Sequence, residues 1–136
     1  MSFLGEIINF FEKRNWLSFF LIFIISASLF GYLASDQTFV DPDSFYHAKM
    51  AQLLWEKGAI TSFPWLSATT LQYKFADHHF LYHLALIPFV KIFPAPWGLK
   101  IATVLFASFA ILAIYWFLRQ LKIPGSFWYI LFLLTI

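Results

Sequence analysis

Two runs without a charged residue, Trp16 to Leu33 and Ile101 to Leu118, most constrain what this chain can fold into. At 18 residues, each is long enough to cross the hydrocarbon core of a bilayer as a helix. The composition agrees, because 61% of the 136 residues are hydrophobic and only 12% are charged. Soluble domains have roughly a quarter of their residues charged. We therefore expect an integral membrane protein.

The apolar runs predict an all-α fold, a polytopic transmembrane helix bundle with about four membrane segments. The segments are expected at 16–33, 76–93, 97–118 and 127–136, with one long loop at 34–79. The last run covers about half of the ~20 residues that a crossing needs, which suggests a fragment cut inside its fourth segment. The density of Lys and Arg favours a cytoplasmic N-terminus and an extracytoplasmic loop, in a plasma membrane of bacterial or archaeal type.

The composition also narrows the chemistry. The chain has no cysteine, which excludes disulfides and thiolate sites. Its net charge is only +2, and no basic run is interleaved with aromatic residues, so nucleic acid is not an expected partner. Five of the seven acidic residues and three of the four histidines lie in the 34–79 loop. Any chemistry is therefore expected there, with oxygen and imidazole groups as ligands.

Inside this loop, the sequence from Val40 to Gly58 predicts an amphipathic helix. Asp41 is suited to the N-cap and Pro42 to the first helical position. Lys57 and Gly58 are typical of a helix end. One interpretation is a connector that lies at the membrane surface, with carboxylates that only cap the helix.

The other interpretation places a site at the start of this helix. Asp41 and Asp43 form a D-x-D pair, and carboxylates at this spacing can share Mg²⁺ or Mn²⁺, which prefer oxygen ligands. Asp43 and His47 are four residues apart and therefore share one helix face. His47 therefore stands one helical turn after the second carboxylate of the pair.

A second cluster, Asp77, His78, His79 and His83, stands where the second membrane segment begins. Asp77 is expected to cap that helix. His79 and His83 are four residues apart, a spacing that lets two imidazoles meet one metal ion or pass a proton. Alternatively, His78 and His79 are interfacial residues and His83 forms a hydrogen bond within the helix bundle.

The run D-S-F-Y-H-A-K, which opens a loop helix after one membrane helix, resembles the first external loop of the polytopic GT-C glycosyltransferases. The nearest likeness is to oligosaccharyltransferase catalytic subunits. In this resemblance Asp43 takes the place of the family aspartate, and Phe45 and Tyr46 take the place of its aromatic residues. His47 stands at the family's Asn or His position and Lys49 at its basic position.

This resemblance implies a membrane glycosyltransferase that takes a sugar from a polyprenyl phosphate or pyrophosphate and transfers it to a protein, glycan or lipid acceptor. A divalent Mn or Mg ion would offset charge on the departing phosphate. Its candidate ligands are Asp43, Asp41 and His79. The resemblance implies that Asp43 and His47 are the catalytic residues, and that His47 or His79 positions the phosphate or deprotonates the acceptor. The candidate substrate-binding residues are Tyr46, Lys49, Asp77, His78 and His83. The chain alone should be inactive, because it lacks most of the bundle that would enclose a lipid donor.

Two other functions remain open at this stage. A non-enzymatic transporter or assembly subunit would use the histidines and Asp77 as an ion or proton path. A zinc-dependent membrane hydrolase would be built on His79 and His83, with a further ligand downstream.

The chain departs from the glycosyltransferase family at one motif. The family's second acidic motif is expected near the fourth segment, but 120–128 contains no acid. Asp77 or the histidines would then supply the missing ligands.

Overall fold

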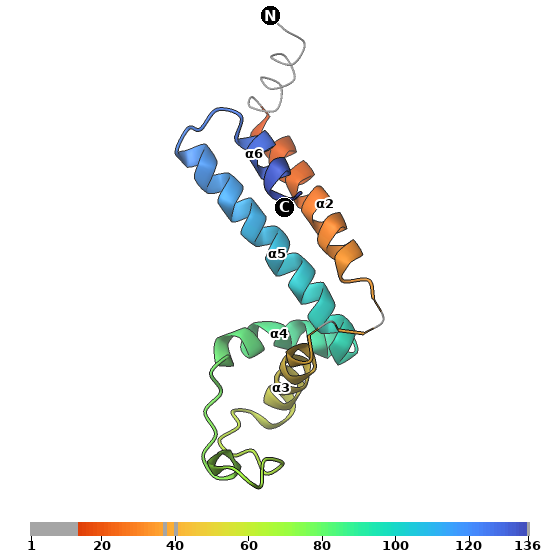
Figure 1. Cartoon of the computed structure of the whole chain (residues 1–136), viewed down its shortest axis with the longest axis vertical. Helices are drawn as coiled ribbons and strands as arrows, with labels where there is room; N and C mark the ends of the chain where they lie inside the picture. Colours follow the sequence, from red (N-terminus) through yellow and green to blue (C-terminus); the bar gives the residue numbers. More distant parts are fainter. Residues whose placement is uncertain (1–13, 37, 40, 136) are drawn as a thin grey trace, which may run out of the picture. The chain divides into compact units, whose positions relative to one another are not determined.

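The computed structural model describes residues 14–36, 38, 39 and 41–135, and within these the chain is helical with no strand (Figure 1). The α-helices are α2 (Asn15–Leu33), α3 (Asp43–Lys57), α4 (Phe80–Ile92), α5 (Ala95–Gln120) and α6 (Ser126–Leu133), with a short 3₁₀ helix η1 (Thr70–Gln72) between α3 and α4. The all-α prediction is confirmed for the described residues. The chain divides into two compact units, one formed up to Ser35 and from Thr103 onward, the other by Asp36–Ala102.

The first unit contains α2, α6 and most of α5, which lie side by side (Figure 1). Its core is built from Ile22, Tyr115, Phe127 and Ile130, all buried. The ring of Phe19 on α2 meets the ring of Tyr115 on α5 edge-on, with centroids 4.8 Å apart. Apolar and aromatic packing therefore joins the three helices.

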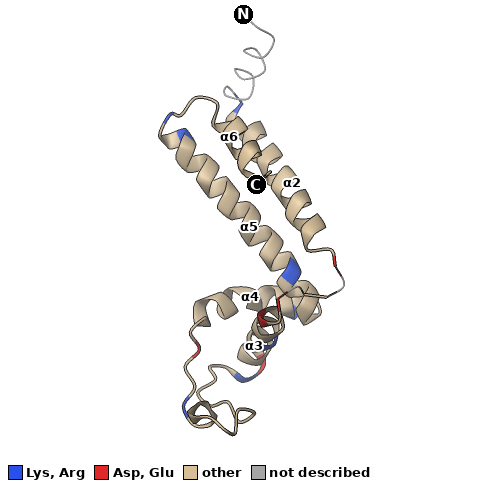
Figure 2. Cartoon of the chain, in the orientation of Figure 1, with Lys and Arg blue, Asp and Glu red and all other residues tan. Residues whose placement is uncertain are grey.

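Two of the described helices, α2 and α5, are long and apolar enough to cross a membrane, by length and composition. Figure 2 shows charged residues toward their ends and none along their middles. Both helices cover the segments predicted at 16–33 and 97–118. Lys13, on which the orientation argument partly depends, lies outside the described residues.

The other two predicted segments are shorter than expected. Helix α4 has 13 residues, about 20 Å at 1.5 Å per residue, whereas a crossing needs about 30 Å. Of the segment predicted at 76–93, only Phe80–Ile92 is helical, because the chain from Asp77 to His79 forms a turn before α4 starts. Helix α6 has only 8 described residues. The described residues thus give two candidate membrane helices, while about four were predicted.

The second unit is organised by α3 packing against α4. The buried apolar residues are Ala48, Met50, Ala51, Leu53 and Leu54 from α3, Leu86 from α4, and Leu99 and Ala102 from the start of α5. The Oδ1 atom of Asp41 accepts a hydrogen bond of 3.0 Å from the backbone N–H of Asp43, the first residue of α3, and so caps the start of this helix. The N-cap position itself is occupied by Pro42, one residue later than predicted. Helix α3 ends at Gly58, whose φ of 75° favours glycine.

The chain between α3 and α4 folds back on itself. The Phe63 backbone N–H donates to the Leu71 carbonyl at 3.0 Å, and the Phe75 N–H donates to the Thr61 carbonyl at 2.8 Å. The Phe63 ring also contacts the rings of Trp65 and Phe75, at 5.0 and 5.1 Å between centroids. Backbone hydrogen bonds and aromatic contacts therefore give this irregular segment a definite shape.

Close approach of two helices explains the glycine at position 98. A Cβ atom placed on Gly98 would lie 2.7 Å from the Phe89 carbonyl oxygen and 2.9 Å from the Val90 backbone nitrogen. Both obstacles are backbone atoms, so neither can rotate away. The start of α5 can therefore contact α4 at this distance only without a side chain.

We predict that Gly98→Ala lowers the thermal stability of the detergent-solubilised protein, because the new methyl group forces α4 and α5 apart. Such overpacking typically costs about 1–3 kcal/mol, against about 1 kcal/mol gained from helix propensity. The matched control is Gly31→Ala in α2, where an added Cβ meets nothing within 4 Å. Thermal unfolding followed by circular dichroism should separate the two variants, and equal melting temperatures would contradict the close approach.

Candidate functional site

Helix α3 and the start of α4 bring together a hydrogen-bonded chain of three side chains. The Oδ2 atom of Asp77 lies 2.6 Å from Nδ1 of His83. The other ring nitrogen of His83, Nε2, lies 2.8 Å from Nδ1 of His47. We call Asp77, His83 and His47 the relay.

The inner part of the relay is shielded from solvent. His83 is fully buried, and the Asp77 side chain is only 8% exposed. The second carboxylate oxygen of Asp77, Oδ1, accepts a 3.0 Å hydrogen bond from the His79 backbone N–H. Asp77 thus caps the start of α4, as predicted, and binds His83 at the same time. Both oxygens of this carboxylate have partners, as burial of a charged group requires.

Aromatic rings surround the relay. The His47 ring lies 5.1 Å from the His79 ring and 5.2 Å from the Tyr82 ring, measured between centroids. The Tyr46 ring lies 5.7 Å from the His83 ring. Every one of these contacts is edge-on. Such edge-on packing helps to hold the planes of the imidazoles in place.

Burial and neighbouring charges shift two pKa values in this cluster. Burial is the main cause that lowers the pKa of His47, and repulsion from His83 and His79 adds to it, while Asp43 and Asp41 act in the opposite direction. Burial, with a contribution from Asp77, raises the pKa of the Tyr46 hydroxyl. At neutral pH, His47 is therefore an uncharged imidazole and Tyr46 an uncharged phenol.

The predicted metal ligands do not come together at one point in the described part of the chain. Asp41 and Asp43 are both exposed at the start of α3, and Asp41 is engaged in capping. The rings of His79 and His83, predicted to meet one metal, have centroids 6.1 Å apart. Within the described part of the chain, no group of three or more His, Asp and Glu side chains is placed to hold a metal ion.

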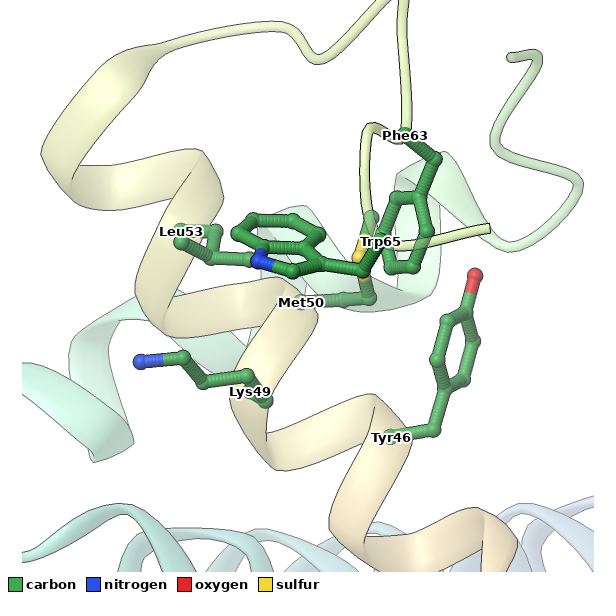
Figure 3. A pocket seen from close by; sticks show the side chains of 6 residues that line it. All are labelled: Tyr46, Lys49, Met50, Leu53, Phe63 and Trp65. Carbon is green, nitrogen blue, oxygen red and sulfur yellow. The ribbon is translucent and has the colours of Figure 1, made fainter. Parts of the chain in front are cut away.

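A hollow of about 210 Å³ lies between one face of α3 and the segment that contains Phe63 and Trp65 (Figure 3). It is lined by Tyr46, Lys49, Met50, Leu53, Phe63 and Trp65. Figure 3 shows the Tyr46 hydroxyl directed toward the side where Phe63 lies, and the Lys49 side chain extending away from Tyr46. Since Tyr46 also packs on His83, it lies between the hollow and the relay.

The structure thus brings together five of the predicted site residues: His47, Asp77, His79, His83 and Tyr46. His78 is exposed, and Lys49 lines the hollow. Tyr82, which contacts His47, and Trp65, which lines the hollow, were not among the predicted site residues. For Tyr82, the available signal was its position directly before His83 in the sequence.

Comparison of the chain with protein-family models, with curated proteins and with solved structures finds no match in any of the three.

We predict that the protein loses stability as the pH falls below 6.5, in part through His47. Because the folded-state pKa of His47 is lowered, the folded protein binds fewer protons than the unfolded chain in this range. The contribution of His47 is therefore complete above pH 6.5 and is lost as the pH falls through the folded-state pKa.

Chemical unfolding of the wild type and of His47→Asn at a series of pH values measures this contribution. The side-chain amide of Asn can still form a hydrogen bond with His83, but it does not titrate. The variant should therefore lose less stability on acidification than the wild type. The same pH dependence in both proteins would contradict the assignment.

Proposed function

We propose that this protein is a membrane glycosyltransferase of GT-C type, which uses a polyprenyl-phosphate-linked or polyprenyl-pyrophosphate-linked sugar at the extracytoplasmic face. The observation that carries the proposal is the relay, which joins His47 of the D-S-F-Y-H-A-K run to a buried carboxylate. His47 follows Asp43 by one helical turn, so a base and an acidic metal ligand share one helix face.

His47 is the proposed general base. Its lowered pKa leaves the ring uncharged at neutral pH, so it can accept a proton from the acceptor group as the sugar is transferred. His83 and Asp77 hold its ring in place through hydrogen bonds. A base of this kind typically contributes a factor of about 10²–10⁴ to a rate.

Asp43 is the proposed ligand of a Mg²⁺ or Mn²⁺ ion. Its carboxylate is exposed and provides the hard oxygen donor that these ions prefer. Such ions are commonly held by one or two protein carboxylates together with phosphate oxygens of the substrate. Asp43, with Asp41 as a second ligand, therefore suits a metal that arrives with the phosphate of the donor. When bound, the metal would offset negative charge on that phosphate.

The hollow supports a substrate site on the same helix. Two of the predicted substrate-binding residues, Tyr46 and Lys49, line it together with Phe63 and Trp65. The ammonium group of Lys49 is the cation nearest in sequence to Asp43 and can attract a phosphate. We propose that an apolar part of a substrate occupies the hollow while its charged part lies toward Lys49.

A second candidate function is a proton path in a non-enzymatic membrane protein. The observation in its favour is again the relay, since a chain of two imidazoles and a carboxylate can carry protons. Proton entry into liposomes that contain the complete protein distinguishes the two functions. A flux abolished by Asp77→Asn, without sugar transfer, would favour the proton path.

We predict that Asp43→Asn abolishes metal-stimulated sugar transfer, with a fall of about 10²-fold or more, because loss of a metal contact removes several kcal/mol from the transition state. Transfer is measured in membranes that contain the complete protein, from a radiolabelled pool of polyprenyl-linked sugars, with and without Mn²⁺. Asp41→Ala should reduce both activity and the stability of α3, since Asp41 caps this helix.

The matched control is Glu56→Gln, which makes the same change of acid to amide at the other end of α3. Glu56 accepts a hydrogen bond from Gln52 at the helix surface, away from the relay. Transfer should be unchanged in this variant. Transfer that is indifferent to both Asp43 and Mn²⁺ would refute the glycosyltransferase proposal and leave the start of α3 as a capped connector.

A further inference from the structure

The direction of the hydrogen bonds in the relay follows from the Asp77 carboxylate. An ionised carboxylate only accepts hydrogen bonds, so the proton between Asp77 Oδ2 and His83 Nδ1 is on the nitrogen. A neutral imidazole has one N–H and one lone pair. The lone pair of His83 is therefore on Nε2, where it faces His47 Nδ1.

The hydrogen bond between the two imidazoles determines which nitrogen of His47 carries the proton. A 2.8 Å contact between two ring nitrogens is a hydrogen bond only if one of them has a proton and the other a lone pair. Because His83 Nε2 supplies the lone pair, His47 Nδ1 must donate. The remaining ring nitrogen of His47, Nε2, then has no proton and presents a lone pair.

We propose that Asp77 and His83 are positioning residues, which set the tautomer of His47 so that its Nε2 atom is the one that takes up a proton. The identity of the proton donor, an O–H or N–H group of the sugar acceptor, rests on the proposed function. The tautomer of His47 does not, since it follows from the two hydrogen bonds with His83 as a neutral imidazole.

The relay can also pass a proton on from His47 to His83. As the O–H or N–H bond of the acceptor group breaks, an N–H bond forms at His47 Nε2. The Nδ1 proton of His47 passes to His83 Nε2, so His47 returns to a neutral ring with its proton on the other nitrogen. The positive charge then resides on His83, beside the Asp77 carboxylate at 2.6 Å.

One backbone group makes this direction testable by a single substitution. The His79 N–H donates to Asp77 Oδ1, so an asparagine at position 77 must place its amide oxygen there. Its NH₂ group then occupies the place of Oδ2 and faces His83 Nδ1. Because an NH₂ group donates, the lone pair of His83 moves to Nδ1 and every hydrogen bond in the relay reverses. His47 Nε2 would then carry a proton.

Nitrogen-15 NMR of the complete, histidine-labelled protein reports which ring nitrogen carries the proton. At about pH 8, where an ordinary histidine is neutral, wild-type His47 should be protonated at Nδ1 and unprotonated at Nε2. The signal is assigned by its loss in His47→Asn. Protonation of His47 at Nε2 in the wild type would overturn the proposal without any substitution in the relay.

Asp77→Asn should invert the tautomers of both His47 and His83, whereas Asp77→Glu, which keeps a carboxylate, should retain the wild-type pattern. Glu56→Gln makes the same acid-to-amide change away from the relay and should leave both rings unaffected. If folded Asp77→Asn keeps the wild-type tautomer of His47, then Asp77 does not set that tautomer and the proposal is wrong.

Measurements of sugar transfer test whether the tautomer of His47 matters for the reaction. Asp77→Asn should lower kcat by about 10- to 100-fold, with KM little changed and partial recovery in Asp77→Glu, because a wrongly protonated base cannot act. If tautomers invert but kcat does not fall, the proposed positioning role is wrong. If transfer does not depend on Asp43, the glycosyltransferase proposal fails, while the NMR result still decides the tautomer of His47.

Discussion

The second unit depends on satisfying the polar groups that α3 and α4 bury between them. A buried carboxylate without partners costs several kcal/mol, which is a large fraction of the stability of a small domain. Asp77 avoids this cost with one hydrogen bond to His83 and one to the His79 backbone. Among the described residues, no buried side-chain nitrogen or oxygen lacks a hydrogen-bond partner. The apolar contacts of α3 and α4 can therefore form around a polar centre.

The elements with strong local signals were predictable from the sequence. The uncharged runs gave α2 and α5, and Asp41 and Gly58 marked the ends of α3, because apolar length and capping are local properties. Asp77 was likewise predicted to cap α4, but the bounds taken from hydropathy began at residue 76, four residues before the helix starts at Phe80.

The relay itself could not be predicted from local spacing. His79 and His83 were paired in the sequence interpretation because they lie on one helix face, and Asp43 was paired with His47 for the same reason. The hydrogen bond that forms joins His83 to His47, 36 residues away. A contact of this kind depends on how α3 packs against α4, which no spacing within either helix specifies.

Relay and metal site make different demands on the carboxylates of this unit. Asp77 already uses both oxygens for hydrogen bonds, so it could join a metal only by giving up His83 or the His79 backbone. Asp43 is exposed and keeps its carboxylate at the surface. In the proposed function, this division places the positioning of the base in the interior and the metal at the helix start, where a phosphate can approach.

The buried contact between Asp77 and His83 also has an electrostatic consequence. With both imidazoles neutral, the relay carries one net negative charge, which is that of the Asp77 carboxylate. Uptake of one proton makes the relay neutral overall, with an imidazolium facing the carboxylate. Removing net charge from a poorly solvated interior is less costly than creating it. A proton taken up by the relay therefore needs no additional counter-ion, because the Asp77 carboxylate already faces the imidazole ring of His83.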